Sequence, residues 1–196
     1  VEAGIRANFV YIEDIGLSTD HKFTDLNNQH IKSLFKLYPW EFMLNEEFGE
    51  HVGSSGTNWL EPLWKSIISN KAILPMLWKM FPQHPNLLPS FFDDELHLAN
   101  LEKHLVKKPI YSREGANISI LKNINGSFEQ EILSSDGPYG EEGFVYQAAQ
   151  ILPKFGNNYT LVGSWLVGDE AAGLSIREDI SAITQDTSRF LPHVIV

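Results

Sequence analysis

Two lysines and one polar loop carry the chemistry that this sequence offers most clearly. Lys71 stands at the expected start of a helix, and Lys108 closes an apolar stretch just before the loop Ser112–Asn117. The loop contains Arg113 and Gly115. Backbone N–H groups of a glycine-bearing loop can wrap phosphate oxygens while nearby cations offset the negative charge. The pattern predicts a polyphosphate site, and the alternatives are an ordinary hairpin with a solvated tip and two solvated lysines.

A second arginine lies at the end of a later strand-like segment. Arg177 follows Ser175-Ile176 and precedes Glu178 and Asp179. Its planar guanidinium suits a transferring phosphoryl group or an anionic substrate. The alternative is a surface ion pair with Glu178 or Asp179.

The string Glu141–Gln150 runs from an acidic loop through a strand into a connector. A connector of this kind can present backbone N–H and C=O groups to the edge of a purine. The alternative is a core strand with a polar exit. The seven histidines show no HExxH spacing, and His84 and His193 stand beside prolines, so we expect them to be structural.

Composition excludes several classes of function. Hydrophobic residues make up 43% of the 196 residues, which is enough for a sizeable core. The formal net charge of −10 disfavours a nucleic-acid or anionic-membrane partner. The chain has no cysteine, so disulfides and thiolate sites are excluded. No apolar run approaches the roughly 20 residues of a membrane span. With no signal peptide visible, the expected location is cytoplasmic, and because position 1 is valine, we expect the natural chain to begin earlier.

The elements that position these residues are helices first and strands later. In Asn58–Phe81, apolar residues recur four apart, which predicts two helices, the second capped by Asn70 with Pro75 in its first turn. Ala7–Ile15 is strand-like. Pro39 divides Ile31–Leu44 into an extended segment and a short helix. The side chains of the helical region that we expect in the core are Trp59, Trp64, Leu74, Met76, Leu77, Trp78, Met80 and Phe81.

The second half is predicted to form a mainly antiparallel sheet. Strands are expected around Ser90–Phe92 and on both sides of the loop at 112–117. The polar stretch Asn123–Gly143 is predicted to be a hairpin tip followed by a loop. Three further strands are predicted at Gly143–Gln147, Tyr159–Val167 and Ala172–Arg177, separated by turn signals. This order indicates an α+β fold with flanking helices.

Several strings, taken together, resemble the glutathionylspermidine synthase family, including its stand-alone acid–amine ligases. The resemblance covers about residues 30–196, in order and with similar spacing. The strings, each numbered at its first residue, are Trp59-Leu-Glu-Pro-Leu-Trp-Lys, Ser69-Asn-Lys-Ala-Ile-Leu-Pro, His84-Pro-Asn-Leu-Leu-Pro, Lys108-Pro-Ile-Tyr-Ser-Arg-Glu-Gly-Ala-Asn, Gly143-Phe-Val-Tyr-Gln, Gly163-Ser-Trp, Ile176-Arg-Glu-Asp and Thr187-Ser-Arg-Phe-Leu-Pro-His.

The resemblance implies an ATP-grasp fold and a ligase that activates a carboxylate as an acyl phosphate for attack by an amine. It implies that Lys71 and Lys108 contact the ATP phosphates, that a mobile loop covers them, and that Arg113 reaches the reacting groups. Arg177 is expected to bind the transferring phosphoryl group or the acyl phosphate. The other positions implied to contact nucleotide are Ser112, Gly115 and Asn117 in the loop, Gln147, Ala148, Ala149 and Gln150 in the hinge, and Ala182, Ile183 and Thr184.

One departure from the family concerns the metal. The family holds magnesium with an aspartate and a later glutamate–asparagine pair that precede the matched region, and Glu13-Asp14 lacks that spacing. We therefore expect a C-terminal portion of a larger ligase, with residues 1–57 as a preceding segment, 58–196 as the nucleotide-binding part and no metal ligand. Its partners would be a small-molecule acid and amine. The portion alone is expected to be inactive. A degenerate, non-catalytic nucleotide-binding or docking module is the alternative, and a plain structural α+β domain is the third.

Overall fold

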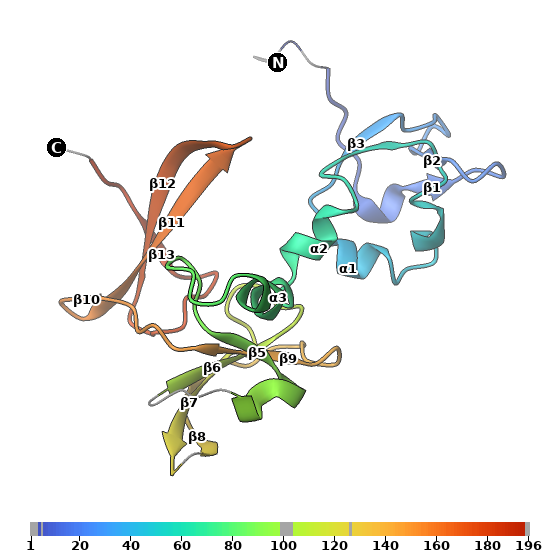
Figure 1. The fold of residues 1–196 in the computed structure, drawn as a ribbon. Coiled ribbons are helices and arrows are strands. Elements are labelled where there is room, and N and C mark those ends of the chain that lie inside the picture. Colours follow the sequence, from blue (N-terminus) through green and yellow to red (C-terminus); the bar gives the residue numbers. More distant parts are fainter. Residues whose placement is uncertain (1–3, 5, 99–103, 126, 195–196) are drawn as a thin grey trace. The chain divides into compact units, whose positions relative to one another are not determined.

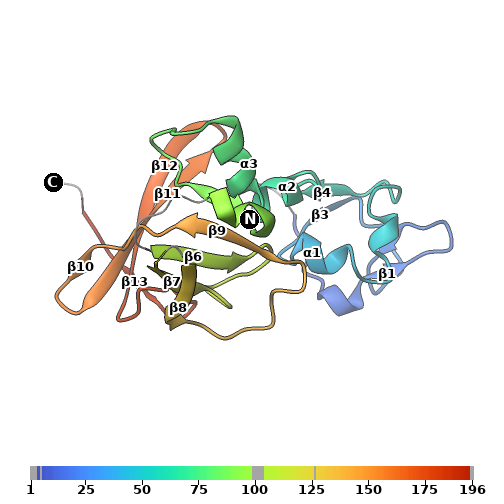
Figure 2. The same cartoon turned by 60° about the horizontal axis from the view of Figure 1, so that its bottom comes forward.

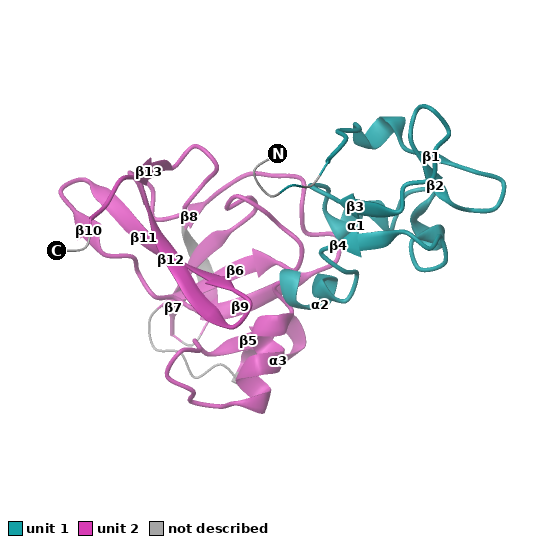
Figure 3. Ribbon diagram, turned by 90° about the horizontal axis from the view of Figure 1, so that it is seen from above, with its two compact units in different colours: residues 1–69 teal, residues 70–196 magenta. Residues whose placement is uncertain are grey.

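The computed structural model describes residue 4 and residues 6–98, 104–125 and 127–194, with the backbone alone over 129–132. The chain forms two compact units, residues 1–69 and residues 70–196 (Figure 3). Each unit has its own set of short elements. Every site residue predicted above falls in the second unit.

The first unit is built around a small aromatic core. The side chains of Phe23, Trp40, Met43 and Val52 are buried there. Trp59 packs edge-on against both rings, with centroids 5.2 Å from Phe23 and 5.4 Å from Trp40. The elements around this core are 3-10 helices at Ile12–Asp14 and Gly49–His51, the antiparallel pair β1 (Gly16–Leu17) and β2 (Phe23–Thr24), the parallel pair β3 (Ser33–Phe35) and β4 (Asn58–Leu60), and the helices α1 (Trp40–Met43) and α2 (Lys65–Ser69).

Two predictions for the first unit are wrong. The expected strand Ala7–Ile15 contains only the 3-10 helix at Ile12–Asp14. The expected helix does not begin at Asn58, because residues 58–60 form β4 beside β3. This pairing joins segments distant in sequence, and the ring of Trp59 favours it by packing into the core. Tertiary contacts have overridden the helical periodicity. The extended segment and short helix predicted in Ile31–Leu44 are confirmed as β3 and α1.

The second unit contains a five-stranded antiparallel sheet that carries most of the predicted site (Figures 1 and 2). Its order is β5-β9-β6-β7-β8, so β9 and β6 are central. The helix α3 (Ile73–Met80) packs against β5. The strands are β5 (Ser90–Phe92), β6 (His104–Pro109), β7 (Ser119–Ile124), β8 (Ser127–Ser134) and β9 (Phe144–Ala148), and a 3-10 helix at Asp93–Leu98 follows β5.

A second antiparallel sheet, in the order β10-β11-β12-β13, holds the C-terminal part of the site. A long hairpin dominates it in Figure 1, in orange and red. Its strands are β10 (Lys154–Phe155), β11 (Asn158–Val167), β12 (Glu170–Asp179) and β13 (Arg189–Leu191). The predicted strands at 159–167 and 172–177 are confirmed, as are the turns between them.

Part of the predicted core of the helical region is wrong. Met76 and Met80 on α3 are 47% and 62% exposed, and Phe81 is 51% exposed. Trp64, before α2, is 59% exposed. The helix α3 has eight residues, and such a short helix can bury one narrow stripe only. That stripe includes Pro75, which is fully buried.

The sequence also misses several strands. The short strands β1, β2 and β10 were not predicted. β8 occupies the polar stretch that was predicted to be a loop, and β13 was not expected. β8 is one of the two edge strands of its sheet, and edge strands tolerate polar residues on the side that faces water. The fold is therefore a mixture of helices and mainly antiparallel sheets, as predicted. Of the described helices, α3 is the longest at eight residues, and none could cross a membrane.

Candidate anion-binding site

Lys108 lies in a partly buried position on the central strand β6. Its Nζ donates a hydrogen bond of 2.7 Å to Oε1 of Gln147 on β9. Burial lowers the pKa of Lys108, because a low-dielectric environment disfavours the ammonium form. Within the described residues no carboxylate pairs with this ammonium. A partly buried ammonium held by a neutral amide is not neutralised by its partner, so it can still attract an anion.

Lys71 joins the start of α3 to the predicted phosphate loop. Its Nζ donates to the carbonyl oxygen of Ser112 at 2.6 Å and to the Ser112 hydroxyl oxygen at 2.8 Å. Its backbone N–H donates to the carbonyl of Ile110 at 3.0 Å. The Asn70 side chain accepts from the N–H of Ala72 at 2.9 Å and so shapes the turn before the helix. Lys71 and Ser112, predicted from separate strings, are therefore in direct contact.

The far end of the loop is anchored as well. Asn117 adopts a left-handed conformation with φ 54°, and its Oδ1 accepts the backbone N–H of Tyr139 at 2.8 Å. The Ser135 hydroxyl donates to the carbonyl of Gly115 and accepts the N–H of Ile118 at 3.1 Å. The segment that follows β8 thus anchors the C-terminal end of the loop. Arg113, between these two anchors, is exposed.

Gly115 brings the loop into contact with residues 183–184, which belong to another stretch that is predicted to contact nucleotide. A Cβ atom added to Gly115 would lie 2.4 Å from the carbonyl oxygen of Thr184 and 3.0 Å from Cγ2 of Ile183. The glycine also has φ +78°, which other residues rarely adopt. Only glycine therefore allows the loop and residues 183–184 to pack this closely.

Asp179 organises the segment that contains residues 182–184. Its two oxygens accept the backbone N–H of Ser181 at 2.9 Å and the hydroxyl of Ser188 at 2.5 Å. The Ser181 N–H first, and then the Ser188 hydroxyl, lower the pKa of Asp179 because they stabilise the carboxylate. The Ser181 hydroxyl accepts the N–H of Ile183 at 3.1 Å, and the Ile183 side chain is buried.

Arg177 is tied to the same segment. It donates to the carbonyl oxygen of Gln185, and its guanidinium carbon lies 4.9 Å from the centre of the Phe190 ring. Its Nε is buried and has no hydrogen-bond partner among the described residues. The Glu178 carboxylate instead pairs with Arg189 at 2.6 Å. Among the described residues, Arg177 therefore does not form the surface ion pair that was considered as the alternative.

A groove of about 400 Å³ opens beside the loop. Of the predicted site residues, Arg113 and Gly115 line it, whereas Lys71, Lys108, Gln147 and Arg177 do not. Three carboxylates also line it, and most of the remaining wall comes from the segment after β8. The lining residues are Arg113, Glu114, Gly115, Ala116, Ser135, Asp136, Gly137, Pro138, Tyr139, Gln185 and Asp186.

The connector after β9 has few free donors. Gln147 lies in the central strand, paired with Ser90 on one side and Val106 on the other. The N–H groups of Ala148 and Ala149 donate to the carbonyls of Pro89 and His104, at 2.8 Å and 3.2 Å. Gln150 is exposed beyond them. At positions 148 and 149, a base edge could find carbonyl acceptors but no N–H donors.

Sequence reasoning missed several residues that build this site, including Ser90, Ser135, Asp179 as an acceptor, Ser181 and Ser188. Serine is common and shows no spacing pattern of its own. The partners of Ser90 and Ser135 are supplied by strands and loops remote in sequence. The local strings therefore contain no signal for these contacts.

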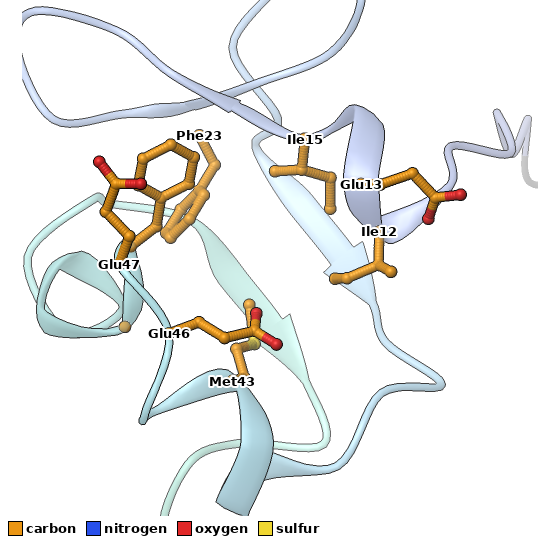
Figure 4. A pocket seen from close by; sticks show the side chains of 9 residues that line it. Ile12, Glu13, Ile15, Phe23, Met43, Glu46 and Glu47 are labelled. Carbon is orange, nitrogen blue, oxygen red and sulfur yellow. The ribbon is translucent and has the colours of Figure 1, made fainter.

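The first unit has a separate pocket of about 220 Å³ (Figure 4). Its apolar floor includes Phe23 and Met43, and Glu46 extends across it in Figure 4. Glu46 accepts a hydrogen bond from the Tyr38 hydroxyl, and this contact raises the pKa of Tyr38. None of the predicted site residues lines this pocket.

Comparison with known proteins identifies the family. The family model described as "Glutathionylspermidine synthase preATP-grasp" matches residues 1–196. This chain belongs to the glutathionylspermidine synthase family. It is 43% identical over 199 residues to a protein of Haemophilus influenzae named "Putative acid–amine ligase", and the match spans 99% of this chain and 50% of that protein.

Other members of the family are more distant. The chain is 36% identical over 139 residues to the bifunctional glutathionylspermidine synthetase/amidase of Escherichia coli K12, covering 69% of this chain and 21% of that protein. It is 29% identical to the trypanothione synthetase of Crithidia fasciculata, covering 92% of this chain and 30% of that protein. The chain thus spans half or less of the length of these relatives.

Proposed function

We propose that this chain is the nucleotide-binding, C-terminal portion of an ATP-dependent ligase with an ATP-grasp fold. The reaction would join a carboxylate to an amine through an acyl phosphate and release ADP. The observation that supports this most strongly is Lys108, a partly buried ammonium whose partner is the neutral amide of Gln147. A triphosphate would supply the negative charge that the described residues do not place beside this cation.

The assigned roles follow from charge and position. Lys108 and Lys71 would bind phosphate oxygens, and the Ser112–Asn117 loop would cover them. Phosphoryl transfer depends mainly on positioning and charge neutralisation, which two lysines and a clamped loop can provide. Arg113, exposed between the loop anchors, would reach the reacting groups, and Arg177 would hold the transferred phosphoryl group. Gln147–Gln150 would face adenine, and Ala182–Thr184 would lie near the nucleotide.

Lys71 would change partners when nucleotide binds. Its ammonium now contacts two oxygens of Ser112. A phosphate oxygen carries more negative charge than a carbonyl or a hydroxyl, so it would compete for the same N–H groups. The Ser112 hydroxyl, once released, would itself be able to donate to a phosphate. Lys71 would then couple phosphate binding to the position of the loop.

Magnesium is the usual companion of ATP in phosphoryl transfer. Among the described residues, no group of three or more histidine, aspartate and glutamate side chains could hold a metal ion. We assign no metal ligand to these residues. The nucleotide-binding part would be residues 58–196, and this portion alone would not turn over substrate.

Nucleotide binding is tested by the thermal unfolding of the full-length protein. Mg-ATP is expected to raise its unfolding temperature, as any ligand that binds only the native state does. The shift should be lost in Lys108→Ala and kept in Lys122→Ala, which removes an exposed lysine of β7 from the same sheet. A protein that shows no shift with ATP, ADP or GTP would not be a nucleotide-binding ligase.

A non-catalytic nucleotide-binding or docking module is the second candidate. The two candidates separate on ADP release. Full-length protein mixed with ATP, magnesium and a panel of acids and amines should release ADP with one acid–amine pair if it is a ligase. Glutathione with spermidine is the first pair to test, because the names of the relatives contain them. ATP binding without ADP release in any mixture would support the module.

A further inference from the structure

A buried serine on β5 is connected to Lys108 through one intervening side chain. Ser90 is 1% exposed, and its hydroxyl donates to the carbonyl of Leu88 at 2.9 Å. The Nε2 of Gln147 donates to the Ser90 hydroxyl oxygen at 3.1 Å. The Oε1 of Gln147 then accepts from Lys108 at 2.7 Å. Three strands of the sheet thus contribute to one chain of hydrogen bonds.

Strand register places these side chains on the same face. Ser90 is directly opposite Gln147 in the β5–β9 pair, and Gln147 is directly opposite Val106 in the β9–β6 pair. Lys108 stands two residues after Val106, so its side chain emerges on that face as well. The contact between Gln147 and Lys108 is therefore a diagonal contact across neighbouring strands. The order of the strands creates it.

The direction of the hydrogen bonds fixes the orientation of the Gln147 amide. A carbonyl oxygen can only accept, so the single hydroxyl proton of Ser90 must point at Leu88. The Ser90 oxygen is then left as an acceptor, and it requires the NH₂ end of Gln147. The oxygen end of the amide must consequently face Lys108. Without Ser90, the NH₂ end of the amide would lose its acceptor, and the Lys108 ammonium alone would orient the side chain of Gln147.

We propose that Ser90 is a positioning residue for the anion site: it locks the amide of Gln147 so that its oxygen holds the Lys108 ammonium in place for a phosphate. A carboxylate at position 147 would hold the ammonium equally well, but it would cancel the charge that an anion needs. The locked amide orients the cation and leaves its charge intact. The phosphate part of this proposal rests on the proposed function, whereas the effect of Ser90 on Lys108 does not.

Ser90→Ala in the full-length protein tests the proposal with two measurements. The first follows the ammonium of Lys108 by NMR in lysine-labelled protein without nucleotide. Loss of the oriented amide oxygen is expected to lower the pKa of Lys108 further than burial already does. The second measures ATP affinity, which is expected to fall about ten-fold, or ~1.4 kcal/mol.

Matched variants separate positioning from general damage. Ser90→Thr keeps the hydroxyl and is expected to restore both readouts. Ser55→Ala removes another buried serine, which is 2% exposed in the first unit, and is expected to leave both unchanged. If Ser90→Ala does not fold, Ser90→Cys nearly preserves the side-chain volume but has a weak acceptor, and it should shift both readouts in the same direction by less.

Each outcome decides the question. An unchanged Lys108 titration in a folded Ser90→Ala or Ser90→Cys protein would overturn the proposal. A changed titration with unchanged ATP affinity would also overturn it, because the amide would then not serve the anion site. If the wild-type protein binds no ATP at all, the proposed function fails, and the titration alone decides whether Ser90 orients Lys108.

Discussion

Gly115 and Thr184 lie so close that no side chain fits between them. A Cβ atom on Gly115 would be 2.4 Å from the carbonyl oxygen of Thr184, a distance that real Cβ contacts do not reach. This contact joins the loop between β6 and β7 to the segment after β12. Two separate stretches that the sequence associates with nucleotide binding are thereby held as one surface.

Gly115→Ala is expected to destabilise the protein by about 3 kcal/mol. Roughly 1 kcal/mol comes from the positive φ, and the rest comes from the backbone shift that relieves the clash with Thr184. Gly156→Ala is the matched control, because Gly156 has φ +60° but open space around its Cβ position. The Gly156→Ala variant should lose only the part of the stability that comes from the positive φ. Chemical denaturation of both variants measures the difference, and equal losses would show that the contact with Thr184 adds nothing.

Lys71→Met is expected to loosen the loop even without nucleotide. The substitution keeps the apolar stem and removes both hydrogen bonds to Ser112. Amide hydrogen exchange at residues 110–114 should therefore accelerate several-fold, since local opening costs less when about two charged hydrogen bonds are lost. Lys122→Met serves as the control. Exchange rates equal to those of the wild type would mean that Lys71 does not hold the loop.

ATP affinity is expected to fall as the pH rises. The fall should begin at a lower pH than it would if Lys108 had the usual lysine pKa. Phosphate binding requires the protonated form of Lys108, and burial lowers its pKa below the usual value of ~10.4. Affinity should therefore decline as the pH rises through that lowered pKa. Lys108→Arg keeps its charge above pH 12, so its affinity should stay level over the same range. Calorimetric titrations between pH 7 and 10 make the comparison, and identical profiles would argue against Lys108 as the phosphate ligand.

Asp179 is expected to make stability acid-sensitive. The native pKa of Asp179 is lowered, so the folded state binds a proton less readily than the unfolded state, whose aspartate pKa is ~3.9. The stabilisation is complete above the unfolded pKa and is lost as the pH falls through the native pKa.

Asp179→Asn should consequently cost about 1 kcal/mol at pH 7 and show a weaker dependence on pH between 4 and 2. Asp169→Asn, in the exposed turn between β11 and β12, provides the reference. Thermal unfolding at a series of pH values measures both. An equally steep acid loss in the two variants would remove Asp179 from this role.

The local sequence pattern predicted the secondary structure correctly where the conformational preference of a segment agreed with its environment in the fold. The strands on both sides of the loop, the long hairpin and the short helix after Pro39 were predicted, because alternation, turn residues and proline act within a few residues. The prediction failed at Trp59, where a ring placed at helical spacing is buried in a core formed by distant residues. It also failed at Met76 and Met80, since a pattern cannot show how much of a short helix will be covered.

By itself, the sequence determined the family, the mainly antiparallel character of the second half and the two lysines as candidate phosphate ligands. Only the tertiary structure decided the partners of those lysines: Gln147, itself bonded to Ser90, for Lys108, and Ser112 for Lys71. The physical reason is that hydrogen bonds and charge compensation depend on distances of a few ångströms, which strand order and register set. These are properties of the folded sheet, and no single stretch of the chain encodes them.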